Sequence, residues 1–169
     1  SLPAQATIIS YHDEADWLAA LTGGTVIHDA FDNDMVSAPS IVFATGITSS
    51  NTGGVFCCND NGISGGEYQN ALGQLGSTAS LLNTWLFPEP IYALAFTIRG
   101  AVPDRLKLSI GAETLAIDNT VGGGRHEFIG VTGLAGVTQA TFQNQGRTIL
   151  YHMDDLFFST APPRGLPLG

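Results

Sequence analysis

The sequence predicts an all-β protein, a jelly-roll-like antiparallel β-sandwich of two sheets with one short N-terminal helix. Three observations predict this class. Only 12% of the 169 residues are charged and 21 are glycine, which suits short strands joined by many turns. In the second half of the chain apolar and polar residues alternate, as they do in sandwich strands. A substantial helical pattern occurs once, whereas a parallel α/β fold would repeat it.

The first elements are a strand and the helix. Residues 7–11 are rich in β-branched side chains and end at Tyr11. Asp13 is a suitable N-cap, Glu14 adds a negative charge to the first turn, and Gly23 with Gly24 provides the stop.

The remaining strands follow from alternation and turn residues. In 91–99, for example, Leu94, Phe96 and Ile98 share one face and Ala95 and Thr97 the other. About nine strands are expected, with two weaker candidates at 41–44 and 47–49. The others are 25–31, 81–87, 91–99, 106–110, 115–117, 127–131, 137–143 and 148–158.

Length and charge limit the domain organisation and the partners. A chain of 169 residues fits one domain, placed at 7–159, with a Pro-rich tail or linker at 160–169. The net charge of -9 argues against nucleic acid and anionic membranes as partners. No apolar run approaches the length of a membrane span. Ala4-Gln5-Ala6 has the small-x-small form of a signal-peptidase site, which suggests export, although a chance Ala-rich start gives the same pattern.

Two adjacent carboxylates, Asp154 and Asp155, interrupt the last apolar run. A charge buried without a partner is costly, so the pair must lie at an exposed strand end or meet a cation. In a jelly roll, neighbouring strands would bring Asp29, Asp32 and Asp34 close to this pair. Irregular groups of carboxylates suit Ca²⁺, and these five residues therefore predict a structural calcium site. The alternative is a solvated turn beside a hydrogen-bonded Asp pair.

Histidines offer a second kind of metal site. His28 and His152 lie beside acidic residues, and His12 precedes Asp13, so a His/Asp site for Zn²⁺ is chemically feasible. No two histidines have the close spacing of a typical zinc motif.

Residues 51–77 form a long Gly- and Asn-rich segment, and loops of this length are usually functional. Its two cysteines, Cys57 and Cys58, are adjacent and could form a strained vicinal disulfide that presents an apolar plate to a ligand. Free thiols or an intermolecular bridge are the alternatives. Tyr68 and Trp85 are the best candidates for a platform on which a sugar ring could stack, because an aromatic side chain can cover the apolar face of a sugar. Tyr68 has the better chance of exposure, since it lies in the predicted loop. For Trp85 a place in the core is the competing interpretation.

No nucleophile elbow, zinc-protease motif or phosphate-binding loop occurs. Glu67 or Glu127 with an aspartate could serve as the acid and base of a glycosidase, a mechanism that depends on a carboxylate separation the sequence does not give.

Four motifs, in this order along the chain, resemble secreted bacterial β-sandwich proteins with C-terminal sorting signals of the PEP-CTERM or VPLPA-CTERM type. They are the helix with the following strand at 16–21 and 25–32, the strand at 93–100, and the segments at 128–131 and 153–158. Asp32 stands where these proteins more often have Glu. The resemblance implies a jelly-roll-like fold and an exported, cell-surface or matrix location.

Together these observations predict a non-catalytic extracellular binding or matrix module with a structural Ca²⁺ and a polysaccharide or cell-surface glycan as partner. A hydrolase or lyase acting on an extracellular polymer, and a purely structural surface protein, are the alternatives. Exposed aromatics on a concave face would favour binding, and facing carboxylates with shifted pKa values would favour an enzyme.

Overall fold

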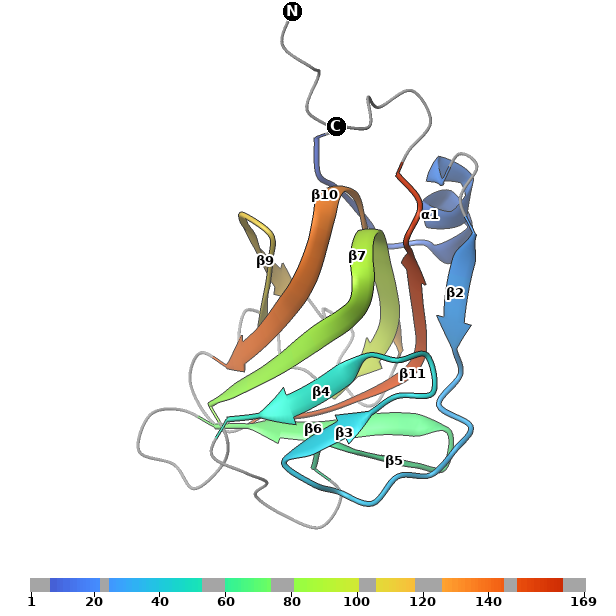
Figure 1. Ribbon diagram of the computed structural model, residues 1–169. Coiled ribbons are helices and arrows are strands. Elements are labelled where there is room, and N and C mark those ends of the chain that lie inside the picture. Colours follow the sequence, from blue (N-terminus) through green and yellow to red (C-terminus); the bar gives the residue numbers. More distant parts are fainter. Residues whose placement is uncertain are drawn as a thin grey trace, which may run out of the picture.

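The protein is described by a computed structural model over residues 7–21, 25–52, 60–73, 81–100, 106–117, 126–144 and 149–162 (Figure 1). Within these ranges it has one helix, α1 (Glu14–Ala20), and the antiparallel strands predicted for an all-β chain. The strands are β1 (Ile9–Tyr11), β2 (Val26–Asp29), β3 (Ser40–Val42), β4 (Thr48–Asn51), β5 (Gly62–Ser64), β6 (Glu67–Leu72), β7 (Leu82–Arg99), β8 (Leu106–Ile110), β9 (Glu113–Ile117), β10 (Glu127–Asn144) and β11 (Ile149–Ser159).

All strands belong to one hydrogen-bonded sheet that folds over on itself to give two facing layers. The first half of β7 pairs with β4 and with the second half of β10, which pairs in turn with β8. The second half of β7 pairs with β11 and with the first half of β10. We call these the β8 layer, which also contains β3, β4 and β9, and the β11 layer, which also contains β1, β2, β5 and β6. The predicted two-sheet sandwich is thus confirmed, with two strands shared by both layers.

The bend between the layers lies in the middle of β7 and β10. Pro88 and Pro90, which lack the N–H needed for the ladder, occupy the bend of β7. Opposite them, the register shifts between Thr132 and Val137, where Gly133 has a φ of 83° that other residues rarely adopt. The sequence predicts separate strands on either side of each of these points, but each pair is one continuous strand of 18 residues.

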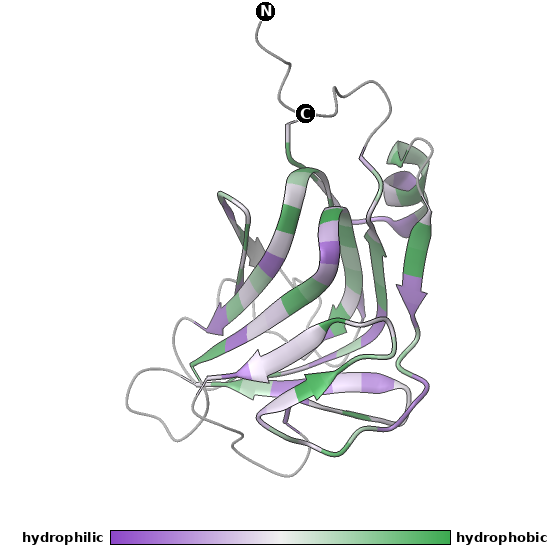
Figure 2. Ribbon diagram, viewed as in Figure 1, coloured by the Kyte–Doolittle hydropathy of each residue, from purple (hydrophilic) through white to green (hydrophobic). Residues whose placement is uncertain are grey.

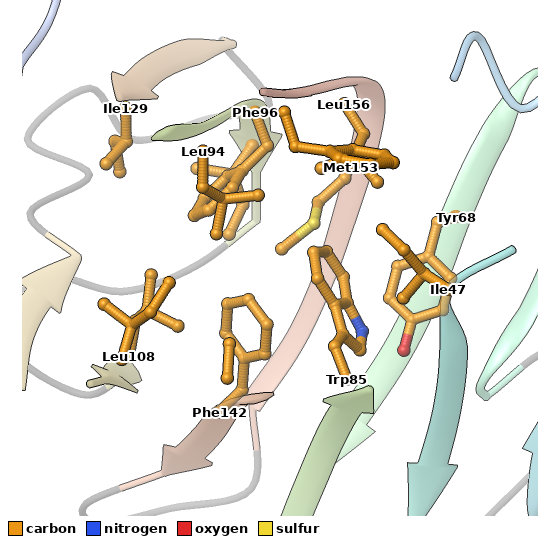
Figure 3. Packing of buried hydrophobic residues seen from close by; sticks show 14 of the residues in the cluster. Ile47, Tyr68, Trp85, Leu94, Phe96, Leu108, Ile129, Phe142, Met153 and Leu156 are labelled. Atoms are coloured by element: carbon orange, nitrogen blue, oxygen red, sulfur yellow. The ribbon is translucent and has the colours of Figure 1, made fainter. Parts of the chain in front are cut away.

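The core fills the space between the layers. Figure 2 shows hydrophobic residues interspersed with hydrophilic ones along β7 and β10, and the buried hydrophobic residues of these strands form much of the core. Phe142 of the β8 layer packs on Trp85 and on Phe96 and Tyr151 of the β11 layer, with ring centroids 4.8, 5.9 and 6.2 Å away (Figure 3). These contacts join the two layers across one continuous core.

Helix α1 covers part of the outer face of the β11 layer. Asp13 caps it as predicted, because its Oδ1 accepts a hydrogen bond of 2.9 Å from the N–H of Asp16. Trp17 is fully buried and donates from Nε1 to the carbonyl of Val131 at 3.0 Å. Its ring packs on Phe128 and Phe157, which is why the predicted outward position Ala95 is buried. Within the described ranges, no helix has the length and apolar character needed to cross a membrane.

β5 and β6 are absent from the predicted strands and lie within residues 51–77, which the sequence predicts as a long functional loop. Residues 67–72 form a strand of the β11 layer, with Tyr68 opposite Met153 of β11. Polar residues such as Gln69 and Asn70 interrupt the apolar alternation by which a strand is recognised in a sequence. The strand forms nevertheless, because its backbone pairs with β11, about 80 residues away in the chain, and these hydrogen bonds do not depend on side chains.

Gly130 lies directly beneath Trp17, where a Cβ would be 2.6 Å from Cδ1 of the indole. We expect Gly130→Ala to displace the indole and lower the free energy of unfolding by about 1–3 kcal/mol. Urea unfolding of Gly130→Ala, Trp17→Leu and the double variant tests this, because the alanine should cost less once the indole is gone. Additive losses would contradict a direct contact between residue 130 and the indole of Trp17.

Candidate functional site

The two carboxylates of β11 are accommodated by a β-bulge. Met153 pairs with Ile98 of β7 and Asp155 with Thr97, so Asp154 is an extra residue on β11. Met153 and Leu156 are both buried, whereas Asp154 and Asp155 are only half-buried. A regular strand would direct one of the two aspartates into the core. The bulge allows both aspartate side chains to stay out of the core. The pair therefore lies in the middle of β11, and not at an exposed strand end, which was one of the two expectations from the sequence.

Each of the two aspartates lies beside a histidine. Oδ1 of Asp155 is 2.8 Å from Nε2 of His28 on β2, and the His28 ring stacks on Phe157 with centroids 4.4 Å apart. Oδ2 of Asp154 is 3.1 Å from Nε2 of His126, which precedes β10. His28 is one of the histidines that the sequence suggests as metal ligands, whereas His126 is not among them.

Asp154 belongs to a larger group on the outer face of the β11 layer, which we call the polar cluster. Strand register explains how its members meet. His152 of β11 lies opposite Arg99 of β7 and opposite Gln69 of β6, and His126 is one position before Glu127, which pairs with Ile98. Four neighbouring segments thus direct polar side chains to the same place. The members of the polar cluster are Glu67, Arg99, His126, His152 and Asp154.

Arg99 holds Glu67 in a two-pronged ion pair. Its Nε donates to Oε2 at 2.8 Å and its Nη2 to Oε1 at 2.6 Å. The hydrogen bonds from Arg99 keep the pKa of Glu67 below its usual value despite partial burial. Such planar, charge-assisted pairs fix geometry as well as energy, so Glu67 is a positioned anion.

Two further members of the polar cluster, His152 and Asp154, are affected mainly by burial. Burial lowers the pKa of His152, with a further contribution from the charge of Arg99, so the neutral imidazole is favoured. Burial raises the pKa of Asp154, while His126 opposes this shift. His152 Nδ1 and Asp154 Oδ1 are buried atoms without a hydrogen-bond partner. Imidazole nitrogens and carboxylate oxygens in this arrangement are potential metal ligands.

The divergent pKa values of Glu67 and Asp154 are also a feature of acid and base pairs in glycosidases. Both oxygens of Glu67, however, accept hydrogen bonds from Arg99, which weakens this carboxylate as a base or nucleophile.

As predicted, the strand that carries Asp29 is a neighbour of β11, because Asp29 lies opposite Leu156, but the five aspartates do not form one group of potential ligands within the described residues. Asp29 is buried, and its two oxygens accept hydrogen bonds from Phe31 N at 3.0 Å and Thr45 Oγ1 at 2.9 Å. Asp32 is exposed, and Asp34 accepts from the N–H of Gly65 at 3.3 Å. Of the five predicted ligands, Asp154 alone belongs to a potential metal-binding group of three or more residues in the described ranges. Calcium binding therefore stays a prediction from the sequence.

The predicted exposure of Tyr68 is wrong, and the stacking platform fails with it. Tyr68 and Trp85 are both 0% exposed and pack with centroids 6.0 Å apart (Figure 3). For Trp85 the competing core interpretation is correct. Cys57 and Cys58 lie outside the described residues.

Tyr68 is buried because its hydroxyl joins a polar network inside the sandwich. It donates to Asn61 Oδ1 at 3.0 Å, accepts from Asn70 Nδ2 at 2.9 Å, and lies 3.1 Å from Ser49 Oγ. Asn51 and Asn70 exchange two amide hydrogen bonds of 2.8 and 2.9 Å. The phenol can therefore leave water without losing its hydrogen bonds, and burial raises its pKa well above the usual value.

The outer face of the β8 layer carries a second polar arrangement. Cross-strand register aligns one hydroxyl residue from each of six strands in a single row, which we call the hydroxyl row. In order across the layer, it consists of Ser40, Ser50, Thr84, Thr141, Ser109 and Thr114. All six are exposed or half-buried. The sequence contains these residues, but only the pairing of β7 with β4 and β10 brings them into line.

Two further features border the hydroxyl row. The neighbouring row contains Val42, Thr48 and Leu86, and the two aliphatic side chains are 55% and 48% exposed. Near the bend of β10, Ser109 and Thr141 contribute to an open depression of about 440 Å³. This face thus combines hydroxyl groups with exposed aliphatic surface.

A scan against protein-family models matches none, and a search among curated proteins finds no similar sequence. Among solved structures, the K1 cleaved adhesin domain of Lys-gingipain from Porphyromonas gingivalis W83 is 17% identical, with 82% of this chain and 100% of that chain covered and a TM-score of 0.43.

A family two carbohydrate esterase from Cellvibrio japonicus is 5% identical over 86% of this chain and 36% of that one, with a TM-score of 0.39. The C-terminal CBM6 of LamC, a marine laminarinase from Zobellia galactanivorans, is 11% identical over 80% of this chain and 99% of that one, with a TM-score of 0.32. Similarities this low carry no conclusion about function, which must come from the residues of this chain.

Removing the Tyr68 hydroxyl should deprive Asn61 and Asn70 of one buried hydrogen bond each, although both keep other partners. We expect Tyr68→Phe to lower the free energy of unfolding by about 1–3 kcal/mol, because Asn61 and Asn70 would lose a partner without gaining water. Denaturant unfolding measures the loss. Tyr92→Phe, at a half-buried tyrosine outside this network, is the matched control, and an equal effect of the two substitutions would refute the network's role.

Proposed function

We propose that this chain is a non-catalytic extracellular binding module for an uncharged polysaccharide, and that the ligand lies on the outer face of the β8 layer. The observation that carries the proposal is the hydroxyl row, which offers one hydroxyl group from each of six neighbouring strands.

The geometry of the row suits an extended chain of sugars. Neighbouring strands are about 4.8 Å apart, so six strands present a line of hydroxyl groups about 24 Å long. Each hydroxyl both donates and accepts hydrogen bonds, as sugar hydroxyls do. A glycan lying across the strands would meet a new hydroxyl at an interval comparable to the length of a sugar ring.

Exposed aliphatic side chains beside the row supply the second requirement of sugar binding. Val42 and Leu86 flank Thr48 in the neighbouring row and can pack against the C–H face of a pyranose ring. They replace the aromatic platform that the sequence analysis assigned to Tyr68 and Trp85, both of which are buried.

Charge favours a neutral ligand. The hydroxyl row has no charged member, and the net charge of -9 repels anionic polymers. Cleavage of a glycosidic bond normally needs two carboxylates about 5–10 Å apart, and neither the hydroxyl row nor the row of Val42, Thr48 and Leu86 contains one. The first observation favours an uncharged ligand, and the second favours binding without hydrolysis at these two rows.

The extracellular location is part of the proposal. It is supported by the resemblance of the four sequence motifs to exported proteins with sorting signals.

The test is binding of the purified chain to neutral polysaccharides. Affinity electrophoresis in gels containing β-glucan, xylan, galactomannan or dextran, with pull-downs on cellulose and chitin, should identify at least one ligand. Titration calorimetry should then show that Thr84→Val and Thr141→Val each weaken binding about fivefold, the effect of about one lost hydrogen bond.

Thr97→Val is the matched control, because Thr97 points outward from the β11 layer and should not contact the ligand. Failure to bind any of these polymers would overturn the proposal and favour a purely structural surface protein. Equal weakening by all three substitutions would show that the ligand does not lie on the hydroxyl row, and release of reducing sugar ends would instead support the hydrolase alternative.

A further inference from the structure

The polar cluster lies on the β11 layer, away from the proposed glycan surface, and has its own chemistry. Glu67, His126 and Asp154 each offer one ligand atom, and the three atoms lie within 4.8 Å of one another. His126 Nε2 is 3.1 Å from Asp154 Oδ2 and 3.8 Å from Glu67 Oε2. Three donor atoms converge here from three different segments of the chain.

Two buried polar atoms without a hydrogen-bond partner at the same place are an independent indication of a binding site. Asp154 Oδ1 and His152 Nδ1 are both buried without a hydrogen-bond partner, and His152 Nδ1 lies 3.8 Å from Glu67 Oε1. A buried polar atom without a partner is costly, and a bound cation would satisfy both of these electron-pair donors.

We propose that the polar cluster is a binding site for Zn²⁺ or a similar divalent transition-metal ion, with Glu67, His126 and Asp154 as ligands. His152 lies outside this group of three but is the candidate for a fourth ligand, because its Nδ1 has no hydrogen-bond partner and lies 3.8 Å from Glu67 Oε1.

The donor types select this class of ion. Zn²⁺ is bound in proteins by histidine nitrogen together with aspartate or glutamate oxygen, usually with four ligands. Ca²⁺ takes six to eight oxygen ligands and makes little use of imidazole. A group with one or two imidazoles and two carboxylates therefore differs from the all-aspartate calcium site predicted from the sequence.

Arg99 acts as a positioning residue in this site. Its hydrogen bonds to both oxygens of Glu67 fix the orientation of the carboxylate, as partners of metal ligands commonly do, and each oxygen keeps a second lone pair. Its positive charge opposes a cation, but Glu67, Asp154 and the adjacent Asp155 outweigh it when the histidines are neutral. The local charge thus remains negative.

A neighbouring His/Asp pair provides the matched control. His28 and Asp155 are 2.8 Å apart on the same layer, but they belong to no group of three potential ligands among the described residues. Substitution of His28 removes the same residue type as substitution of His126, and it leaves the proposed ligands and the charge of Asp155 in place.

The experiment is metal binding by the whole chain after treatment with a chelator. Titration calorimetry and thermal unfolding with Zn²⁺, Co²⁺, Ca²⁺ and Mg²⁺ should show saturable Zn²⁺ binding with a rise in Tm. Co²⁺ should give an absorption spectrum characteristic of mixed nitrogen and oxygen ligands. His126→Ala and Asp154→Asn should each weaken Zn²⁺ binding about tenfold or more, whereas His28→Ala should retain it.

Circular dichroism of each metal-free variant shows whether it folds, and His126→Gln replaces His126→Ala if that variant does not. Absence of Zn²⁺ binding by the wild-type chain would overturn the proposal. The proposal would also be overturned if His126→Ala and Asp154→Asn bound Zn²⁺ as tightly as the wild-type chain does. Equal loss in His28→Ala would place the ion elsewhere, and a larger rise in Tm with Ca²⁺ than with Zn²⁺ would refute the ion class. The glycan proposal is tested separately, because the two sites lie on different layers.

Discussion

The antiparallel pairing of β7 with β10 is the constraint on which the rest of the structure depends. Both strands run through the bend and belong to both layers, so their register fixes which residues face the core in each. A slip of one residue would exchange the inner and outer faces of both strands. Phe96 and Phe142 would leave the core, and Thr84 and Thr141 would no longer complete the hydroxyl row. The two candidate surfaces thus depend on the same pairing as the core.

The outer face of the β11 layer is divided between structural and chemical roles. At one end, Trp17 of α1 covers Ala93 and Ala95, and this part of the face becomes a small second core. At the other end the face is open and carries the polar cluster. The bulge at Asp154 separates the requirements of core and surface, because it keeps Met153 and Leu156 buried while both aspartates reach their histidines. Neither aspartate remains as an unpaired charge in the core.

Buried polar residues also explain why exposure was hard to predict. Tyr68 stands in a Gly- and Asn-rich segment that has the composition of a surface loop. In the structure the polar residues of this segment satisfy one another, and Asn61 and Asn70 bind the Tyr68 hydroxyl inside the sandwich. A polar composition predicts exposure only when the polar groups have no partners within the protein, and here the partners come from distant strands.

The sequence by itself determined the fold class, the capped helix and most strands, because these depend on local alternation, turn residues and the Asp13 cap. It also indicated that Asp154 and Asp155 needed an unusual environment. Only the tertiary structure decided that β7 and β10 are continuous, that 67–72 is a strand, and that Arg99, His126 and Asp154 meet. The reason is that these features depend on pairing between residues far apart in the chain, and strand register is set by the packing of the whole core.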